Sequence, residues 1–228
     1  MREGVKVSTQ EAANIEAKTR TQSGSVQWKT ERQWRLTASH FGEIISVTER
    51  RDMAKFCQSM HDPKNLNKVP AIRHGLMYES AALEKFSDIT GKAVVRSGFC
   101  VDPELPFLGA SPDGFVEGEE AVVEVKCPFR ARHQMITRET VELKLFDFLE
   151  NVDGKICLKK SHKYMYQIIG QMKLAKKSYG YFVVYTFKDL HYEKINLDED
   201  FFNNSMLPKL KTFYDHEYCP YVASTLKL

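Results

Sequence analysis

A carboxylate and an ammonium two positions apart, Glu124 and Lys126, have the residue types and spacing of a chemical site. Both fall in the predicted strand 121–127, and because side chains alternate along a strand, they share one face. The strand is otherwise apolar, so we expect both of its faces to be covered. A buried ion costs several kcal/mol unless it has partners. Either the two side chains form a simple ion pair on a half-exposed face, or they belong to a functional site.

Asp113 lies just before this strand, in the sequence Ser-Pro-Asp-Gly at 111–114, which is typical of a turn. If the segment 113–117 pairs with the strand as a hairpin, the Asp113 carboxylate comes near the end of the strand that carries Glu124 and Lys126. Hard oxygen ligands of this kind suit Mg²⁺ or Mn²⁺, which also take substrate phosphate oxygens. A nearby lysine can orient or deprotonate a water, or offset charge in the transition state.

Two further polar side chains lie on predicted helices. Glu79 is one helical turn from Leu83, so it lies on the apolar stripe of its helix and needs a partner there. That partner is either a core arginine or lysine, or a metal site. Gln167 shares one helix face with Tyr164 and Gln171. It is either part of an ordinary polar flank or a group that reaches a water or a phosphate.

The elements that must position these residues follow from hydrophobic periodicity and turn signals. Residues 1–26 are polar and aperiodic, so we expect a flexible N-terminal tail, followed by a single domain over 27–228. We then expect helices from 28 to about 89 with breaks near 61–63 and 70, short β-type runs over 92–127, a hairpin around 151–154, a helix over 161–177 capped by Ser161, two strands within 179–197 and a closing helix over 198–215. This order predicts an α/β (α+β) fold with a mixed central β-sheet flanked by helices.

Composition excludes several classes of protein. The 228 residues are 43% hydrophobic and 28% charged, which excludes wholesale disorder. The sequence has neither an apolar run of membrane-span length nor the apolar core of a secretory signal, so we expect an intracellular protein, nuclear or cytoplasmic, without a membrane partner. The five widely spaced cysteines predict neither a disulfide framework nor a zinc site. The net charge of +3 neither requires nor excludes a nucleic-acid partner.

Together, the motifs resemble those of the PD-(D/E)XK nucleases. The motifs follow one another along the chain in the order found in that family: Glu79 on its helix, then Ser-Pro-Asp-Gly at 111–114, Glu-Val-Lys at 124–126 and Tyr-x-x-Gln at 164–167. More narrowly, the chain is similar to the lambda exonuclease or YqaJ-type viral recombinase branch, through Trp-Arg-Leu-Thr-Ala-Ser at 34–39 and the Cys-Pro-Phe that follows Lys126. The resemblance covers about residues 28–187. The segment 130–160 looks more like the eukaryotic, transposon- or virus-derived members.

The resemblance implies a restriction-endonuclease-like core and a role for each residue of the central constellation. Asp113 and Glu124, with the backbone carbonyl of Val125, would bind the catalytic metal. Glu79 would complete the site through a second metal or a water. Lys126 would position the attacking water.

The resemblance also implies roles for residues farther from the metal. Gln167 would support Lys126 or the attacking water. Arg32 and Ser39 would hold the 5′ phosphate of a DNA end, since a guanidinium can bind two phosphate oxygens at once. Arg35 lies nearby and is the alternative to Arg32.

The function that the resemblance implies is that of a Mg²⁺-dependent deoxyribonuclease, with Mn²⁺ as a substitute. It would hydrolyse phosphodiester bonds as a 5′→3′ exonuclease on double-stranded DNA ends, in recombination or end processing. The family analogy adds a single-strand annealing recombinase as a partner and a homotrimer as the assembly. The alternatives are a structure-specific or nicking endonuclease with the same metal site, and a non-catalytic DNA-binding module. The metal site does not exclude RNA as a substrate.

Overall fold

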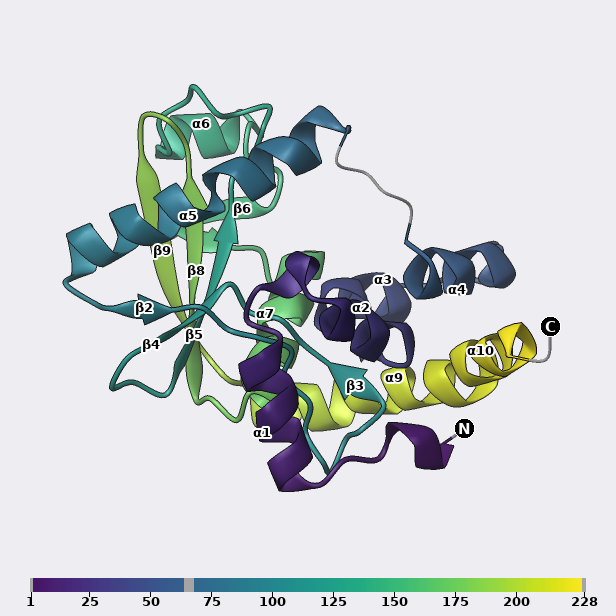
Figure 1. Ribbon diagram of the computed structural model, residues 1–228. Helices are drawn as coiled ribbons and strands as arrows, with labels where there is room; N and C mark the ends of the chain where they lie inside the picture. The colour runs from purple at the N-terminus through teal and green to yellow at the C-terminus, as the bar shows by residue number, and fades with distance from the viewer. Residues whose placement is uncertain (1, 64–67, 227–228) are drawn as a thin grey trace.

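The computed structural model describes residues 2–63 and 68–226, and its centre is a five-stranded mixed β-sheet (Figure 1). The strands lie in the order β2-β4-β5-β8-β9. They span Val94–Val95 (β2), Gly114–Val116 (β4), Ala121–Lys126 (β5), Tyr179–Tyr185 (β8) and Leu190–Asn196 (β9). β5 and β8 run parallel, and the other neighbours are antiparallel. A mixed central sheet flanked by helices confirms the expected fold class.

α5 and α7 cover the two faces of this sheet. The helices of the described chain are Thr9–Lys18 (α1), Val26–Gln33 (α2), Ala38–Ile45 (α3), Met53–His61 (α4), Pro70–Thr90 (α5), Arg138–Glu142 (α6), Lys163–Leu174 (α7), Glu199–Phe201 (α8), Leu207–Phe213 (α9) and Cys219–Thr225 (α10). Short 3-10 turns at Arg2–Val5 and Gln22–Gly24 and π turns at Phe202–Met206 and Tyr214–Tyr218 complete the helical part. In Figure 1, α5 crosses one side of the sheet, while α7 lies on the other side with α3 packed against it.

β5 is buried on both faces because its side chains alternate between two hydrophobic cores. Val123 and Val125 belong to the core that contains Phe86 of α5. Val122 faces the opposite way, into the larger core that contains Ile168 of α7. A polar side chain on this strand therefore has almost no access to water, and Glu124 is 3% exposed.

Two small two-stranded sheets lie beside the central one. β1 (Leu36–Thr37) pairs in parallel with β3 (Leu108–Gly109) and interrupts the helical pattern expected from 28 to 89. β6 (Leu149–Val152) pairs with β7 (Lys155–Leu158) as an antiparallel hairpin. The hairpin expected around 151–154 is therefore confirmed. Asp153 and Gly154 at its turn both have positive φ, as a two-residue type I′ hairpin loop requires.

The N-terminal segment is the main departure from expectation, because the described part of residues 1–26 is not a flexible tail. Ser8 and Glu11 form a capping box at the start of α1. Ile15 is 5% exposed and packs in a small core with Phe99. The expectation was wrong because α1 buries only a narrow face, so its sequence shows too few apolar residues to reveal a helical period.

Two helix ends also differ from expectation. The helix expected to begin at Ser161 has His162 as its N-cap, and the imidazole Nδ1 accepts a hydrogen bond from the Tyr164 N–H at 3.3 Å. The closing helical stretch, expected to end near 215, continues to Thr225. Its second half buries Tyr218 and Val222, which explains the added length.

All five cysteines are free thiols, in agreement with their spacing. Within residues 2–63 and 68–226, none of the helices is long and apolar enough to cross a membrane.

Candidate active site

The β4–β5 hairpin brings Asp113 to the strand that carries the other candidate ligands. Gly114 pairs with Val123, and the Asp113 N–H donates to the Val123 carbonyl at 3.0 Å. The Asp113 carboxylate then accepts from the Val125 N–H at 2.7 Å. The hairpin expected from the sequence is therefore present, and it fixes the first carboxylate near the C-terminal end of β5.

Glu124 has a partner for each of its carboxylate oxygens. Its Oε1 accepts from Lys126 Nζ at 2.5 Å and from Gln167 Nε2 at 2.6 Å. Its Oε2 accepts from Gln171 Nε2 at 2.6 Å. These charge-assisted bonds offset the cost of burying the carboxylate. The sequence placed Gln171 on the same helix face as Gln167 but gave no reason to single it out.

Lys126 is held by α7 as well as by its own strand. Its Nζ donates to Gln167 Oε1 at 3.3 Å and lies 4.3 Å from the ring centroid of Tyr164. Burial alone would lower the pKa of Lys126, but the neighbouring Glu124, Tyr164 and Asp113 outweigh burial and raise that pKa above its ordinary value. The lysine is therefore a cation at neutral pH, suited to orienting a water rather than to deprotonating one.

The Asp113 carboxyl group has a pKa raised well above its ordinary value. Burial is the main cause, and the nearby carboxylates of Glu124 and Glu79 add to it. Two carboxylates and a backbone carbonyl make a hard oxygen donor set, and a divalent cation between them would relieve this repulsion. The residues present therefore fit Mg²⁺ or Mn²⁺.

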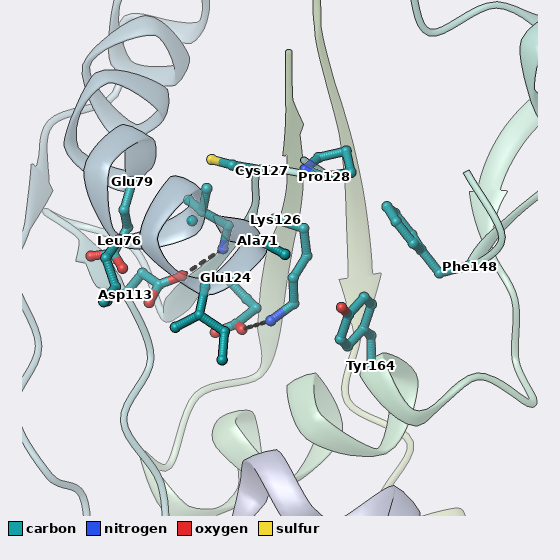
Figure 2. A pocket seen from close by; sticks show the side chains of 13 residues that line it. Ala71, Leu76, Glu79, Asp113, Glu124, Lys126, Cys127, Pro128, Phe148 and Tyr164 are labelled. Carbon is teal, nitrogen blue, oxygen red and sulfur yellow. Dashed lines mark hydrogen bonds and ion pairs between the residues drawn. The ribbon is translucent and has the colours of Figure 1, made fainter. Parts of the chain in front are cut away.

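Glu79 reaches the same place from α5, on the opposite side from α7. With Asp113, Glu124 and Lys126 it lines a cavity of about 360 Å³, which Figure 2 shows from close by. The Glu79 carboxylate forms an ion pair with Arg96, so it has a salt-bridge partner, although that arginine is exposed rather than in the core.

No three His, Cys, Asp or Glu side chains in the described residues lie close enough together to hold a metal ion by themselves. The donors at this cavity are the carboxylates of Asp113 and Glu124 and the carbonyl of Val125. Water and substrate oxygens would have to complete the coordination of a small hard cation, as they do for Mg²⁺ in general.

Arg32 and Arg35 lie at a second, smaller cavity of about 200 Å³ and differ in how they are used. Arg35 is 3% exposed, and its guanidinium donates to the carbonyls of Pro106 at 2.9 Å and Val5 at 3.0 Å and forms an ion pair with Glu31. Arg35 is thus fully engaged in holding the fold together.

The Arg32 guanidinium is free of such bonds. It lies over the Trp28 ring, 4.2 Å from the centroid, and has no hydrogen-bond acceptor among the residues that the structure describes. Burial lowers its pKa to about 10, so it remains charged at neutral pH. The Trp28 indole N–H donates to the Ser111 hydroxyl at 2.8 Å, and this contact links the small cavity to the turn that carries Asp113.

Ser39 lies in the first turn of α3, between the cavity-lining residues Thr37 and His40, but does not itself line the cavity. Its exposed hydroxyl is 3.1 Å from the Thr37 hydroxyl. Thr37 is the N-cap of α3, and its side chain makes no capping hydrogen bond in the described structure. Uncapped amides at a helix N-terminus attract anions. His40 lines the cavity too, and burial together with Arg32 lowers its pKa to about 4, so its imidazole is neutral.

Comparisons with known proteins bear on the family and the fold of the chain. The model of the YqaJ-like viral recombinase domain matches residues 27–178. An alkaline exonuclease from Laribacter hongkongensis superposes with a TM-score of 0.67 at 22% identity, over 89% of this chain and 97% of its own. A phage-related exonuclease from Haemophilus somnus gives 0.57 at 14% identity, over 85% and 96%.

The Shutoff and Exonuclease Protein of Kaposi's sarcoma-associated herpesvirus gives a TM-score of 0.64 at 12% identity, over 93% of this chain and 73% of its own. No curated protein matches the chain by sequence. At these identities the solved structures establish the fold, while the match of the domain model over most of the chain establishes the family. The chain belongs to the family of YqaJ-like viral recombinase domains and has the PD-(D/E)XK fold of the alkaline exonucleases.

Proposed function

We propose that this chain is a Mg²⁺-dependent nuclease that hydrolyses phosphodiester bonds in DNA, with Mn²⁺ as a substitute. The single observation that carries the proposal is the convergence of Asp113, Glu124 and Lys126 at one cavity, where Glu124 is buried, Asp113 is half-buried and the pKa of Asp113 is raised. A structural ion network needs charges that balance. Here the carboxylates of Asp113 and Glu124 face the single ammonium of Lys126, so one negative charge is left that a bound cation would neutralise.

The ion would be held by Asp113, Glu124 and the Val125 carbonyl, with Glu79 reaching it through a water or a second ion. When bound, it supplies Lewis-acid stabilisation of the scissile phosphate and of the leaving oxygen. The Lys126 ammonium orients the attacking water and offsets charge that develops on the phosphate. Gln167 binds both Glu124 Oε1 and Lys126 Nζ, so it sets the angle at which the lysine faces that water.

The substrate that we propose is a double-stranded DNA end that carries a 5′ phosphate. Arg32, the open N-terminus of α3 and the Ser39 hydroxyl offer donors for a terminal phosphate, and Trp28 links this cavity to the Asp113 turn. Cleavage next to a bound 5′ end would proceed 5′→3′ and release 5′-mononucleotides. In support, the Laribacter enzyme is named an alkaline exonuclease and has been solved with dAMP.

A linear duplex and a covalently closed circle of the same sequence, each incubated with Mg²⁺ or with EDTA, test this proposal. We expect degradation of the linear duplex alone, in Mg²⁺ alone, and faster from 5′-phosphate than from 5′-hydroxyl ends. Nicking of the circle would establish the endonuclease alternative. Binding without cleavage of either DNA would establish a non-catalytic DNA-binding module.

Whether the substrate is DNA or RNA requires a separate assay, because the herpesvirus relative has been solved in complexes with DNA and with RNA. We propose DNA, and a duplex RNA of the same sequence should be cleaved more slowly. Cleavage of RNA at an equal rate would broaden the substrate class.

By family analogy we also propose a homotrimer and a single-strand annealing recombinase that takes the 3′ strand. Light scattering of the purified chain and co-purification with such a recombinase test these two points. A monomer, or a recombinase that does not bind, would remove the corresponding part of the proposal.

A further inference from the structure

The segment before α2 lies outside the part of the chain that matches the family model, yet it is attached to the loop before β3. The Glu16 carboxylate accepts from the Gly98 N–H at 2.9 Å, and the Thr19 hydroxyl accepts from the Phe99 N–H at 2.7 Å. A side chain at position 98 would overlap the Glu16 carbonyl, so this close approach requires glycine there. α1 is therefore docked firmly just before the chain reaches Gln22.

Gln22 reaches from this segment to the turn that carries Asp113. Its side-chain Nε2 donates to the Pro112 carbonyl at 2.9 Å and to the Ser97 carbonyl at 3.0 Å. Its φ is 45°, in the left-handed region that is unfavourable for residues other than glycine. Such a conformation persists only where surrounding contacts stabilise it, and these two hydrogen bonds are contacts of that kind.

The carbonyl of Pro112 belongs to the peptide group that joins Pro112 to Asp113. Gln22 donates to the oxygen of this peptide group, and the Asp113 N–H of the same group donates to the Val123 carbonyl at 3.0 Å. The peptide is thus held from both sides, by the N-terminal segment and by β5. A rotation of this peptide would move the Asp113 carboxylate relative to Glu124.

We propose that Gln22 is a positioning residue for the metal site. By holding the Pro112–Asp113 peptide, it fixes the separation of the Asp113 and Glu124 carboxylates. Mg²⁺ demands near-ideal octahedral geometry, so its affinity is sensitive to that separation. The inference rests on the proposed function, which assigns both carboxylates to the metal, and it adds a part of the chain outside the family match to the site.

Three variants of the full-length chain separate the hydrogen bonds from the backbone conformation. Gln22→Ala removes both bonds and keeps the unfavourable φ, whereas Gln22→Gly removes both bonds and relieves it. Gln10→Ala is the matched control, because Gln10 is an exposed glutamine of α1 whose amide donates to Asn14. Two readouts need no cleavage: Mg²⁺ binding by titration calorimetry without DNA, and amide hydrogen exchange of residues 108–116 in the metal-free chain.

We expect both Gln22 variants to bind Mg²⁺ about 5- to 30-fold more weakly than the wild type, the range that the loss of one or two hydrogen bonds allows. The Asp113 amide should also exchange faster in both. Gln22→Ala should melt at a lower temperature than Gln22→Gly, because only alanine retains the strained φ. Gln10→Ala should match the wild type in every measurement.

Two outcomes would overturn the inference in different ways. If the wild type binds Mg²⁺ and cleaves DNA while both Gln22 variants keep its Mg²⁺ affinity and exchange rate, the positioning role is wrong and the proposed function stands. If the wild type neither binds Mg²⁺ nor cleaves DNA, the proposed function fails and the positioning role with it.

Discussion

The two candidate ligand sites of this chain are built in opposite ways. Around Glu124, each carboxylate oxygen already has donors from within the protein, supplied by Lys126 and by two glutamines of α7. Around Arg32, the guanidinium rests on an indole and has no acceptor in the described part of the chain. The first site is organised before any ligand arrives, whereas the second presents donors that only an anion would satisfy.

The difference separates two tasks. Cleavage requires ligands and a water held within a fraction of an ångström, which internal hydrogen bonds provide. Capture of a DNA end requires donors that are unpaired until a phosphate arrives, because a donor already bonded within the protein gains little from a ligand. Variants at each site should therefore fail differently, in rate at the first site and in end preference at the second.

Among the variants that compare the two sites, the largest effect is expected at Lys126. Lys126→Met keeps the length of the side chain but removes the ammonium, so cleavage of a linear duplex should slow by about 10³-fold, in the range seen for lost electrostatic stabilisation of a transition state. Single-turnover rates measure this loss. Lys173→Met, at a half-buried lysine of α7 that pairs with Glu199, is the control and should cleave at the wild-type rate. A Lys126→Met variant with wild-type activity would contradict the assignment.

Arg35 should matter for stability and not for end preference. Arg35→Met leaves the carbonyls of Pro106 and Val5 and the carboxylate of Glu31 without their donor, so the free energy of unfolding should fall by about 3 kcal/mol. Urea denaturation measures the change, and the folded variant should still prefer 5′-phosphate ends. Loss of that preference with unchanged stability would transfer the phosphate role from Arg32 to Arg35.

The pH dependence of folding should report His40. Burial and Arg32 hold its pKa at about 4, below the ordinary value of 6.5. Between these pH values His40 binds a proton in the unfolded chain but not in the folded chain. The contribution of His40 to the free energy of unfolding is therefore constant above about pH 6.5 and decreases as the pH falls towards 4.

We expect this loss to be on the order of 2 kcal/mol between pH 7 and 4. Denaturation at several pH values should show a shallower dependence of the free energy of unfolding on pH for His40→Gln than for the wild type. Inorganic phosphate should also flatten the wild-type slope, because an anion beside His40 favours its protonation. Equal slopes in the wild type and His40→Gln would exclude this residue as the source.

A smaller effect is expected at Arg32. Arg32→Gln should raise the KM for 5′-phosphate ends about 10-fold, the cost of one lost charge-assisted hydrogen bond, and leave 5′-hydroxyl ends unaffected. Competition between the two kinds of end measures the preference directly. Arg50→Gln, an exposed arginine on the loop before α4, serves as the control. If Arg32→Gln raises the KM for 5′-phosphate and 5′-hydroxyl ends equally, the cavity does not bind the terminal phosphate.

The strand, the turn and the order of motifs could be predicted from the sequence because each has a local signal. Alternation placed Glu124 and Lys126 on one face of β5, and Ser-Pro-Asp-Gly marked the turn that delivers Asp113. Gln171 was missed because its contact with Glu124 depends on how α7 crosses β5, which a helix period does not show. Gln22 lay in a segment expected to be flexible, and its contact with Pro112 spans 90 residues.

We propose above that Asp113 and Glu124 together bind a divalent cation that is required for DNA cleavage. The Asp113→Asn variant tests this proposal most directly. Burial and neighbouring carboxylates raise the pKa of Asp113, so a neutral amide of the same shape should fold at least as stably as the wild type without metal. The decisive measurement is the rate of linear-duplex cleavage in Mg²⁺ by this folded variant and by the wild type. We expect the variant to be at least about 10³-fold slower. A folded Asp113→Asn chain that cleaves at the wild-type rate would contradict the claim.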